Sequence, residues 1–113
     1  MNTIDYNEFG KYCIIHKNKG SYHIALIRDI CPEIQKQLCI LLVQRIVTEN
    51  DVQSIKVAIV KSNFPQSSCF FKNLGFQTKK IEKIGNNLTL EHMKIDSADF
   101  SKSVTKNYFL SRL

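Results

Sequence analysis

The chain has 113 residues, of which 43% are apolar and 23% are charged, and its net charge is +6. A chain of this length folds as one domain, 1–113, and buries roughly two-thirds of its unfolded surface. It contains 4 glycines, 2 prolines and 7 phenylalanines, which excludes disordered, collagen-like and low-complexity proteins. The longest apolar run, 38–43, is too short to span a bilayer, and the first ten residues do not resemble a signal peptide. We therefore expect a cytoplasmic protein without membrane contact.

The positive charge is concentrated in the second half of the chain. Residues 1–60 contain seven Lys and Arg against six Asp and Glu, whereas residues 61–113 contain nine against four. Nucleic acid, an acidic partner or a phosphorylated cofactor would all be attracted to the second half. Lysine outnumbers arginine by thirteen to three, however, and lysine is the poorer reader of bases. We therefore favour a solvated, lysine-rich surface and regard nucleic-acid binding as the lesser alternative.

The four cysteines, at positions 13, 31, 39 and 69, do not have the spacing of a metal site. In the cytoplasm they are expected to be reduced thiols. Cys13 and His16 are three residues apart in a predicted strand, which places them on opposite faces. We therefore predict no metal site and interpret the cysteines as small buried apolar residues.

The first half of the chain predicts a hairpin followed by a long helix. Residues 12–16 and 22–27 are rich in β-branched and apolar side chains, and the segment between them, 17–20, predicts a turn. The second strand is mostly apolar and is expected to be buried on both faces. Pro32 marks the start of the helix, which is expected to end near residues 49–51. Its apolar side chains recur with helical spacing and form a face broad enough to be buried on more than one side.

The second half predicts a strand, a short helix, a hairpin and a final helix. Residues 55–60 alternate as a strand, and Pro65 begins the short helix. Two strands, 76–84 and 88–95, flank the turn 85–87. The complete order is β-β-α-β-α-β-β-α, which is typical of an α/β (α+β) domain.

The final helix, 97–110, is amphipathic. Its apolar face is formed by side chains four residues apart, Phe100, Val104 and Tyr108. We expect this face to pack on the sheet of the same chain and to fill space otherwise left open there. Pairing with a second copy is the alternative, because an exposed stripe of this kind invites association. An open sheet edge is a second route to a homodimer.

The segment from Asn63 to Phe76 reads Asn-Phe-Pro-Gln-Ser-Ser-Cys-Phe-Phe-Lys-Asn-Leu-Gly-Phe. It resembles the Asn…(Phe/Leu)-Tyr-x-x-x-Gly-Phe signature of the GNAT superfamily of N-acetyltransferases. The long helix and the strand before it, and the hairpin after it, stand where that family has them. The resemblance covers about residues 20–95. It implies a GNAT-like fold, in which helices flank a mixed central sheet.

The resemblance also implies a place for acetyl-CoA. The family binds this cofactor where two parallel strands diverge, which here are 22–27 and 55–60. Strand amides would hold the pantetheine arm, and the N-terminus of the long helix would hold the pyrophosphate, because free amides and the helix dipole attract anions. The positions implied to bind the cofactor are Ile27, Gln35, Lys36, Leu38, Ile40 and Asn63.

The pyrophosphate loop departs from the family pattern Pro-x-x-(Arg/Gln)-x-x-Gly-x-(Gly/Ala). Pro32 and Gln35 match it, but Leu38 and Ile40 stand where the family has small residues that let the backbone approach phosphate. Their helical spacing predicts that the helix begins near Pro32, so that their amides are bonded within the helix. Nearby acidic side chains would oppose an anion, and Lys36 would offset them in part. Acetyl-CoA is therefore expected to bind weakly.

The catalytic positions implied by the resemblance are also altered. Phe71 stands where the family has the tyrosine that protonates the leaving thiolate, and phenylalanine donates no proton. Cys69 is a candidate acid and His23 a candidate base, because the pKa of an imidazole suits proton transfer near neutral pH. For both we favour a structural role. Only about twenty residues precede the second strand, where the family has a first strand and two helices that shape the acceptor site, so the resemblance implies a shortened acceptor side.

Three functions are consistent with these observations. The favoured one is a degenerate GNAT-like module that binds a protein partner, or acyl-CoA weakly, with weak or no transfer. The alternative is an active N-acetyltransferase that moves an acetyl group from acetyl-CoA to an amine by positioning and oxyanion stabilisation. The second alternative is a basic nucleic-acid-binding domain, although no signature of a known nucleic-acid-binding motif is seen.

Overall fold

The computed structural model describes residues 10–109. Its elements in chain order are β1 (Cys13–Asn18), β2 (Ser21–Leu26), α2 (Pro32–Thr48), β3 (Ser54–Val60), α3 (Pro65–Leu74), β4 (Gln77–Gly85), β5 (Leu88–Asp96), α4 (Ser97–Val104) and the π-helix η1 (Thr105–Phe109). The order of strands and helices predicted from the sequence is confirmed. The final helix, predicted over 97–110, instead divides into α4 and the short η1.

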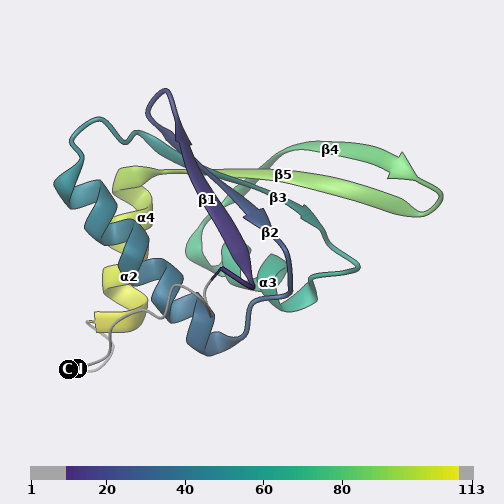
Figure 1. Cartoon of the computed structure of the whole chain (residues 1–113), viewed down its shortest axis with the longest axis horizontal. Helices are drawn as coiled ribbons and strands as arrows, with labels where there is room; N and C mark the ends of the chain where they lie inside the picture. The colour runs from purple at the N-terminus through teal and green to yellow at the C-terminus, as the bar shows by residue number, and fades with distance from the viewer. Residues whose placement is uncertain (1–9, 110–113) are drawn as a thin grey trace.

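The five strands form one mixed sheet in the order β1-β2-β3-β5-β4. β2 and β3 pair in parallel, and the other neighbouring strands pair antiparallel. A parallel pair needs a crossover connection, which α2 provides between β2 and β3. The helices α2, α3 and α4 all lie on one side of the sheet (Figure 1). The described chain therefore has two layers, with helices on a single face.

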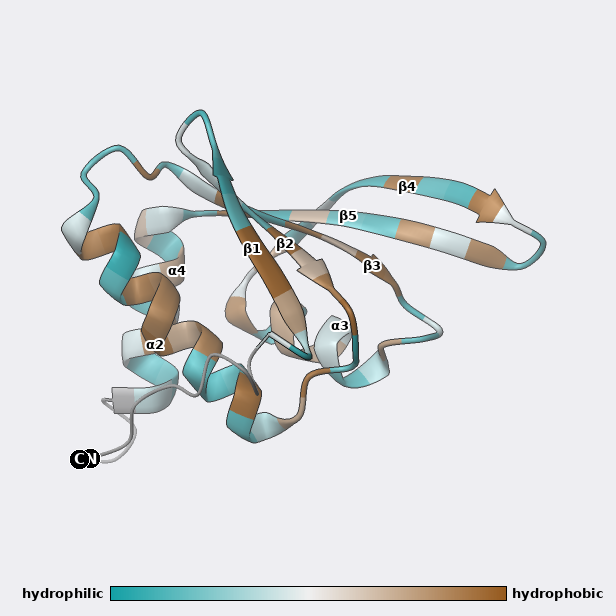
Figure 2. Cartoon of the chain, viewed as in Figure 1, coloured by the Kyte–Doolittle hydropathy of each residue, from teal (hydrophilic) through white to brown (hydrophobic). Residues whose placement is uncertain are grey.

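The core lies between the sheet and these helices. In β3, Ile55, Val57 and Ile59 are at most 3% exposed and point toward the helices, because alternate residues of a strand face opposite sides. Lys56, between them, is exposed on the other side. Figure 2 shows hydrophobic residues along β1, β2 and β3 and on part of α2. The buried residues of the described chain form one cluster, so one core supports all of these elements.

The second face of the sheet is uncovered in the described part of the chain. Tyr22 and Ile24 of β2 face the helices and are 4% exposed, whereas Ala25 is exposed and His23 is half-buried on the opposite side. The expectation that β2 is buried on both faces is therefore wrong. A short apolar run is compatible with burial on one face or on two, and here no helix reaches the second face.

α4 packs within the chain, as predicted, but at a different place. Phe100 is 1% exposed and Val104 is fully buried, and the Phe100 ring meets that of Phe76 with 6.2 Å between centroids. The Ser97 hydroxyl donates to the Val52 carbonyl at 2.9 Å, which ties the start of α4 to the loop before β3. This anchor directs α4 to the same side of the sheet as α2 and α3. The prediction that α4 fills otherwise open space on the sheet is wrong, because the second face of the sheet stays uncovered in the described chain (Figure 1).

α2 is the longest helix and begins at Pro32, where proline loses no helical hydrogen bond. Its apolar face is as broad as predicted: the buried residues are Ile34, Leu38, Cys39 and Leu42, and the partly buried ones are Leu41, Val43 and Ile46. Val47, on the remaining side, is 71% exposed. Among residues 10–109, neither α2 nor any other helix is long and apolar enough to cross a membrane.

The β4–β5 hairpin projects beyond the helix layer (Figure 1) and gives the molecule an elongated shape of 44 × 27 × 27 Å. β4 is exposed along its whole length. Ile81 and Ile84 are 65% and 48% exposed, because no helix lies beneath the distal half of the hairpin. This half contributes little to the core.

Candidate functional site

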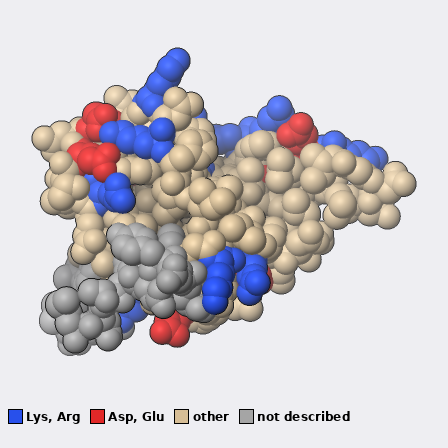
Figure 3. Space-filling view, viewed as in Figure 1, with Lys and Arg blue, Asp and Glu red and all other residues tan. Residues whose placement is uncertain are grey.

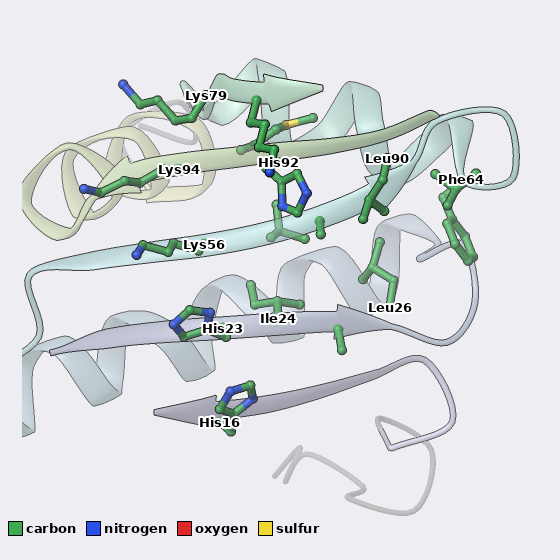
Figure 4. Close-up of a pocket in the computed structure, with 16 residues that line it drawn as sticks. His16, His23, Ile24, Leu26, Lys56, Phe64, Lys79, Leu90, His92 and Lys94 are labelled. Carbon is green, nitrogen blue, oxygen red and sulfur yellow. The ribbon is translucent and has the colours of Figure 1, made fainter. Parts of the chain in front are cut away.

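The site implied by the resemblance lies where β2 and β3 diverge. Their parallel pairing ends at Ala25 and Ala58. Beyond that point β3 continues to pair with β5, as far as Val60 and Leu90, while β2 remains paired with β1. A cavity of about 740 Å³ opens here and extends over the uncovered face of the sheet (Figure 4). The predicted divergence of the two parallel strands is therefore present.

The backbone amide of Ile27, which the resemblance placed against a pantetheine arm, is already paired. It donates to the Tyr12 carbonyl at 2.7 Å, and the neighbouring Arg28 amide reaches the same oxygen at 3.2 Å. The chain leaving β2 therefore stays attached to the segment before β1. A pantetheine arm at this position would need other donors.

The N-terminus of α2 differs from a phosphate-binding loop in the way the sequence predicts. Leu38 and Ile40 lie inside the helix, and Leu38 is fully buried in the core. The Gln35 side chain donates to the Ile30 carbonyl at 2.8 Å, so it closes the preceding loop instead of reaching outward. Lys36 is exposed on the helix surface. Of the cofactor positions on α2, Lys36 alone offers an exposed positive charge.

Asp29, in the loop between β2 and α2, binds the first turn of α3. Its carboxylate accepts from the Ser67 amide at 2.8 Å, from the Ser67 hydroxyl at 2.6 Å and from the Gln66 amide at 3.1 Å. The Ser67 hydroxyl in turn accepts from the Ile30 amide at 2.9 Å. An internal carboxylate therefore occupies the helix amides that could otherwise attract an anion. We call Asp29, Ile30 and Ser67 the α3 clasp.

Neither Phe71, at the family's tyrosine position, nor the candidate acid Cys69 faces the cavity. Phe71 is fully buried, and its ring lies 4.9 Å from those of both Phe70 and Phe76. Cys69 is exposed and accepts a weak hydrogen bond from the Asn73 amide at 3.6 Å, but it does not line the cavity. All four cysteines of the chain are free, but two of them are buried and Cys69 is exposed, so the interpretation of the cysteines as buried apolar residues is correct only in part.

Asn63 lies in the turn that follows β3. Its backbone amide donates to the Val60 carbonyl at 2.9 Å, and its side chain is exposed. The Ser62 hydroxyl lies 3.4 Å from its amide oxygen. Asn63 therefore shapes the turn, and it is not among the residues that line the cavity.

His23, the candidate base, does line the cavity. Its ring stacks on that of His16, with 5.1 Å between centroids (Figure 4). Partial burial, the neighbouring His16 and Lys56 together lower the pKa of His23 below the ordinary histidine value. A lowered pKa favours the neutral ring at pH 7, and a neutral imidazole is able to accept a proton.

Sequence reasoning missed most of the residues that surround His23. The cavity is lined by four lysines and three histidines, and no Asp or Glu is among its lining residues. The basic members are His16, His23, Lys56, Lys79, Lys80, His92 and Lys94. Alternation along the strands and the pairing of Lys80 with His92 place all of them except Lys79 on the side away from the core, and Lys79 lies at an irregularity in β4. Their proximity depends on strand order and register, which the sequence does not show.

The remaining basic residues are spread over the surface. In the view of Figure 3, Lys and Arg side chains occur on the hairpin and on the body, and the acidic side chains form smaller groups among them. Near the β1–β2 turn, the Lys17 ammonium binds the Glu49 and Asp51 carboxylates at 2.9 and 2.6 Å. Exposed pairs of this kind contribute little to stability.

Solved structures of similar fold are acetyltransferases. Mutant forms of the spermidine/spermine N-acetyltransferase SpeG from Vibrio cholerae match at 17% identity and a TM-score of 0.55, over 80% of this chain and 62% of that chain. Spermidine N-acetyltransferase from the same organism, in complex with CoA and spermine, matches at 15% identity and a TM-score of 0.55, over 79% and 60%. A dodecameric structure of spermidine N-acetyltransferase from Vibrio cholerae matches at 18% identity and a TM-score of 0.54, over 85% of this chain and 61% of that chain.

These matches establish a GNAT-like fold, as the sequence predicted. The chain spans only about 60% of the length of the structures that it matches. No protein-family model matches the chain, and no curated protein matches its sequence.

Proposed function

We propose that this protein is a GNAT-like binding module with weak or no acetyl transfer. The observation that carries the proposal is the start of α2. The helix begins at Pro32 without a loop of small residues, so the amides of Leu38 and Ile40 are used inside it. In the adjacent α3 clasp, the Asp29 carboxylate binds the N-terminus of α3. The α3 amides are therefore occupied by an internal carboxylate. At α2 no side chain caps the helix, but no glycine-containing loop precedes it and the acidic Glu33 in its first turn opposes a pyrophosphate group.

The proton-transfer groups support the same conclusion. Phe71 is enclosed by aromatic rings, and Cys69 lies outside the cavity. His23 alone among the candidate catalytic residues faces the cavity. A base without an organised acid or anion site gives slow transfer at best.

An active N-acetyltransferase is the alternative, and the neutral His23 ring at the cavity is the observation that favours it. A solved neighbour binds CoA and spermine. A polyamine is a poor acceptor here, however, because the cavity carries four lysines and no carboxylate among its lining residues. An acceptor for this chain would be a neutral or acidic amine.

Location and self-association belong to the proposal as well. The four free thiols are suited to the reducing cytoplasm. One solved neighbour is a dodecamer. In the described sheet β1 and β4 are edge strands, which are available for pairing with a second copy. Light scattering over a range of protein concentrations measures whether a homo-oligomer forms.

Calorimetric titration with acetyl-CoA, paired with thermal unfolding, tests the proposal. A ligand at a hundred times its Kd would stabilise the fold by about 2.7 kcal/mol. We expect a stabilisation below about 0.5 kcal/mol at millimolar acetyl-CoA, because Asp29 occupies the α3 amides and α2 lacks a loop of small residues before it. We also expect no release of CoA thiol when amines are added.

Two variants sharpen this test. Lys36→Glu, at the start of α2, should abolish any weak heat of binding, whereas Lys102→Glu, on α4, should leave it unchanged. Tight binding of acetyl-CoA with catalysed thiol release that His23→Gln abolishes would overturn the proposal in favour of the active enzyme. Binding without turnover would leave the module interpretation intact.

A further inference from the structure

The uncovered face of the sheet carries a row of basic side chains. His16, His23, Lys56 and Lys94 are register partners on four successive strands, so they form one line across β1, β2, β3 and β5 (Figure 4). All four line the cavity. At the β1 end of this row the two histidine rings stack on each other, with 5.1 Å between their centroids.

A second row, apolar on three strands, runs beside the first. Ile14, Ala25 and Ala58 are register partners on β1, β2 and β3. Ile14 is 56% exposed, and the two alanines form a shallow strip because their side chains are short. The strip ends at His92 on β5, which pairs with Ala58. Leu90 and Phe64 bound the cavity beyond this row.

The ionisable side chains near the centre of this face are all basic. No carboxylate is among the residues lining the cavity. Glu82, at the hairpin margin, is the nearby acid, and it is paired with His92 at 3.1 Å. Glu82 also lies near Lys80, so the carboxylate acts at the margin and not on the basic row formed by His16, His23, Lys56 and Lys94.

We infer that the uncovered face docks an acidic amphipathic helix of a partner protein, which names the partner of the binding module and therefore rests on the proposed function. Rows two residues apart on a strand lie about 7 Å from each other, and a helix is about 10 Å across. One helix thus covers both rows. Its apolar stripe would lie over Ala25 and Ala58, which allow close approach, and its carboxylates would reach Lys56 and Lys94.

The same observations disfavour nucleic acid as the occupant. Proteins that bind single strands combine a basic groove with aromatic rings on which bases stack. Here the centre of the face is aliphatic, and Phe64, the phenylalanine among the cavity residues, is partly buried. The basic side chains on the face are lysine and histidine, without the arginine that recognises phosphate by two hydrogen bonds. Aliphatic contacts to Ile14 and Leu90 suit a peptide side chain.

The test is fluorescence anisotropy with a synthetic peptide of fourteen residues, built as a helix with leucines on one stripe and glutamates beside it. We expect binding with a micromolar Kd, and weaker binding by about tenfold or more for the same peptide with glutamine in place of glutamate. The double variant Lys56→Glu/Lys94→Glu should weaken binding by a similar factor. The matched control Lys102→Glu/Lys106→Glu, on α4 and η1, should change it by less than about twofold.

A second variant separates docking of a helix from attraction by charge alone. Ala25→Lys adds a positive charge to an exposed position but obstructs the alanine strip. We expect it to weaken peptide binding despite the added charge. Tighter peptide binding by this variant would overturn the inference, and so would stronger binding of a uridine oligonucleotide than of the peptide. No binding of the acidic peptide at millimolar concentration would overturn it as well.

The two proposals fail in different experiments. Tight binding of acetyl-CoA with turnover that His23→Gln abolishes overturns the binding-module function whatever the peptide does. Absence of peptide binding by a folded protein that also does not turn over acetyl-CoA overturns the docked helix and leaves the module function standing. Circular dichroism of each variant confirms that the fold is retained.

Discussion

Phe71 stands at the signature position where the GNAT family carries tyrosine, and its side chain is enclosed in the core. The ring is fully buried between Phe70 and Phe76, with 4.9 Å between each pair of centroids. Edge-to-face packing of this kind stabilises a core beyond the burial of area. The side chain therefore acts in folding, and a hydroxyl at this ring would be shielded from water.

Phe71→Tyr should consequently destabilise the protein without creating activity. We expect a loss of about 1–3 kcal/mol in the free energy of unfolding, because a buried hydroxyl without a partner pays its desolvation cost. Urea unfolding measures the loss. Phe64→Tyr is the matched control, since Phe64 borders the cavity and a hydroxyl there can reach water. A stable Phe71→Tyr variant that transfers acetyl groups would contradict this account.

His23 should make the stability depend on pH. Burial, followed by His16 and Lys56, lowers the pKa of His23 in the folded state below 6.5. The unfolded chain then binds the proton more readily, so the stability is present above pH 6.5 and falls as the pH drops through that value. We expect chemical unfolding between pH 7.5 and about 5.5 to show this decline.

Two variants isolate the contribution of His23. His23→Gln should flatten the decline between pH 7.5 and about 5.5, because glutamine does not titrate. His16→Gln removes one cause of the lowered pKa but leaves the burial, so it should reduce the decline less. An unchanged slope in His23→Gln would show that other groups produce the pH dependence.

The β1–β2 turn shows how a single backbone position fixes an element. Lys19 and Gly20 have φ values of +50° and +81°, which is the geometry of a tight hairpin turn. A Cβ atom at Gly20 would lie 2.9 Å from the Asp51 carbonyl oxygen. The Gly20 carbonyl also accepts from the Gln53 amide at 2.7 Å, so the turn is attached to the loop before β3.

Gly20→Ala should therefore lower the free energy of unfolding more than a glycine-to-alanine change near the other hairpin turn. We expect a loss above about 1 kcal/mol, because both the positive φ and the carbonyl contact oppose a side chain. Gly85→Ala is the control, since the nearest atom to its Cβ would be a Leu88 methyl at 3.9 Å. Thermal unfolding compares the two. Equal stabilities would mean that the turn shifts freely to admit the alanine.

The order of the elements could be predicted from local signals. Pro32 and Pro65 mark helix starts, and Gly75 ends α3 with a φ of +105°. The position of α4 could not be predicted in the same way. Amphipathic spacing identifies an apolar face but does not say which surface covers it. That choice depends on contacts between residues distant in sequence, such as Ser97 with Val52.

Part of the candidate site could likewise be predicted from local sequence signals, and part of it could not. Helical spacing correctly placed Leu38 and Ile40 inside α2. The α3 clasp and the basic row were not predicted, because each joins elements that are far apart in the chain. Lys56, for example, meets His23 and Lys94 only through the parallel register of β2 and β3 and the antiparallel register of β3 and β5.

At the scale of the whole molecule, the buried core lies under one end of the sheet and the largely exposed β4–β5 hairpin forms the other end. Helices α2, α3 and α4 cover one face near β1, β2 and β3, and the β4–β5 hairpin extends away from them (Figure 1). β3 pairs on both sides and is the most enclosed strand. The distal hairpin has hydrogen-bonded strands but few buried side chains. Local opening should therefore begin in the hairpin.

Matched isoleucine truncations should reveal this asymmetry. Ile59→Ala, in β3, should cost about 2–4 kcal/mol because it leaves a cavity in the core, whereas Ile81→Ala should cost less than about 0.5 kcal/mol. Hydrogen exchange should show β3 amides protected up to the global unfolding free energy and residues 82–89 exchanging far sooner. A large cost at Ile81 would mean that the hairpin is covered in solution. If that cost also grew with protein concentration, the cover would be a second copy of the chain, since self-association stabilises the folded state by mass action.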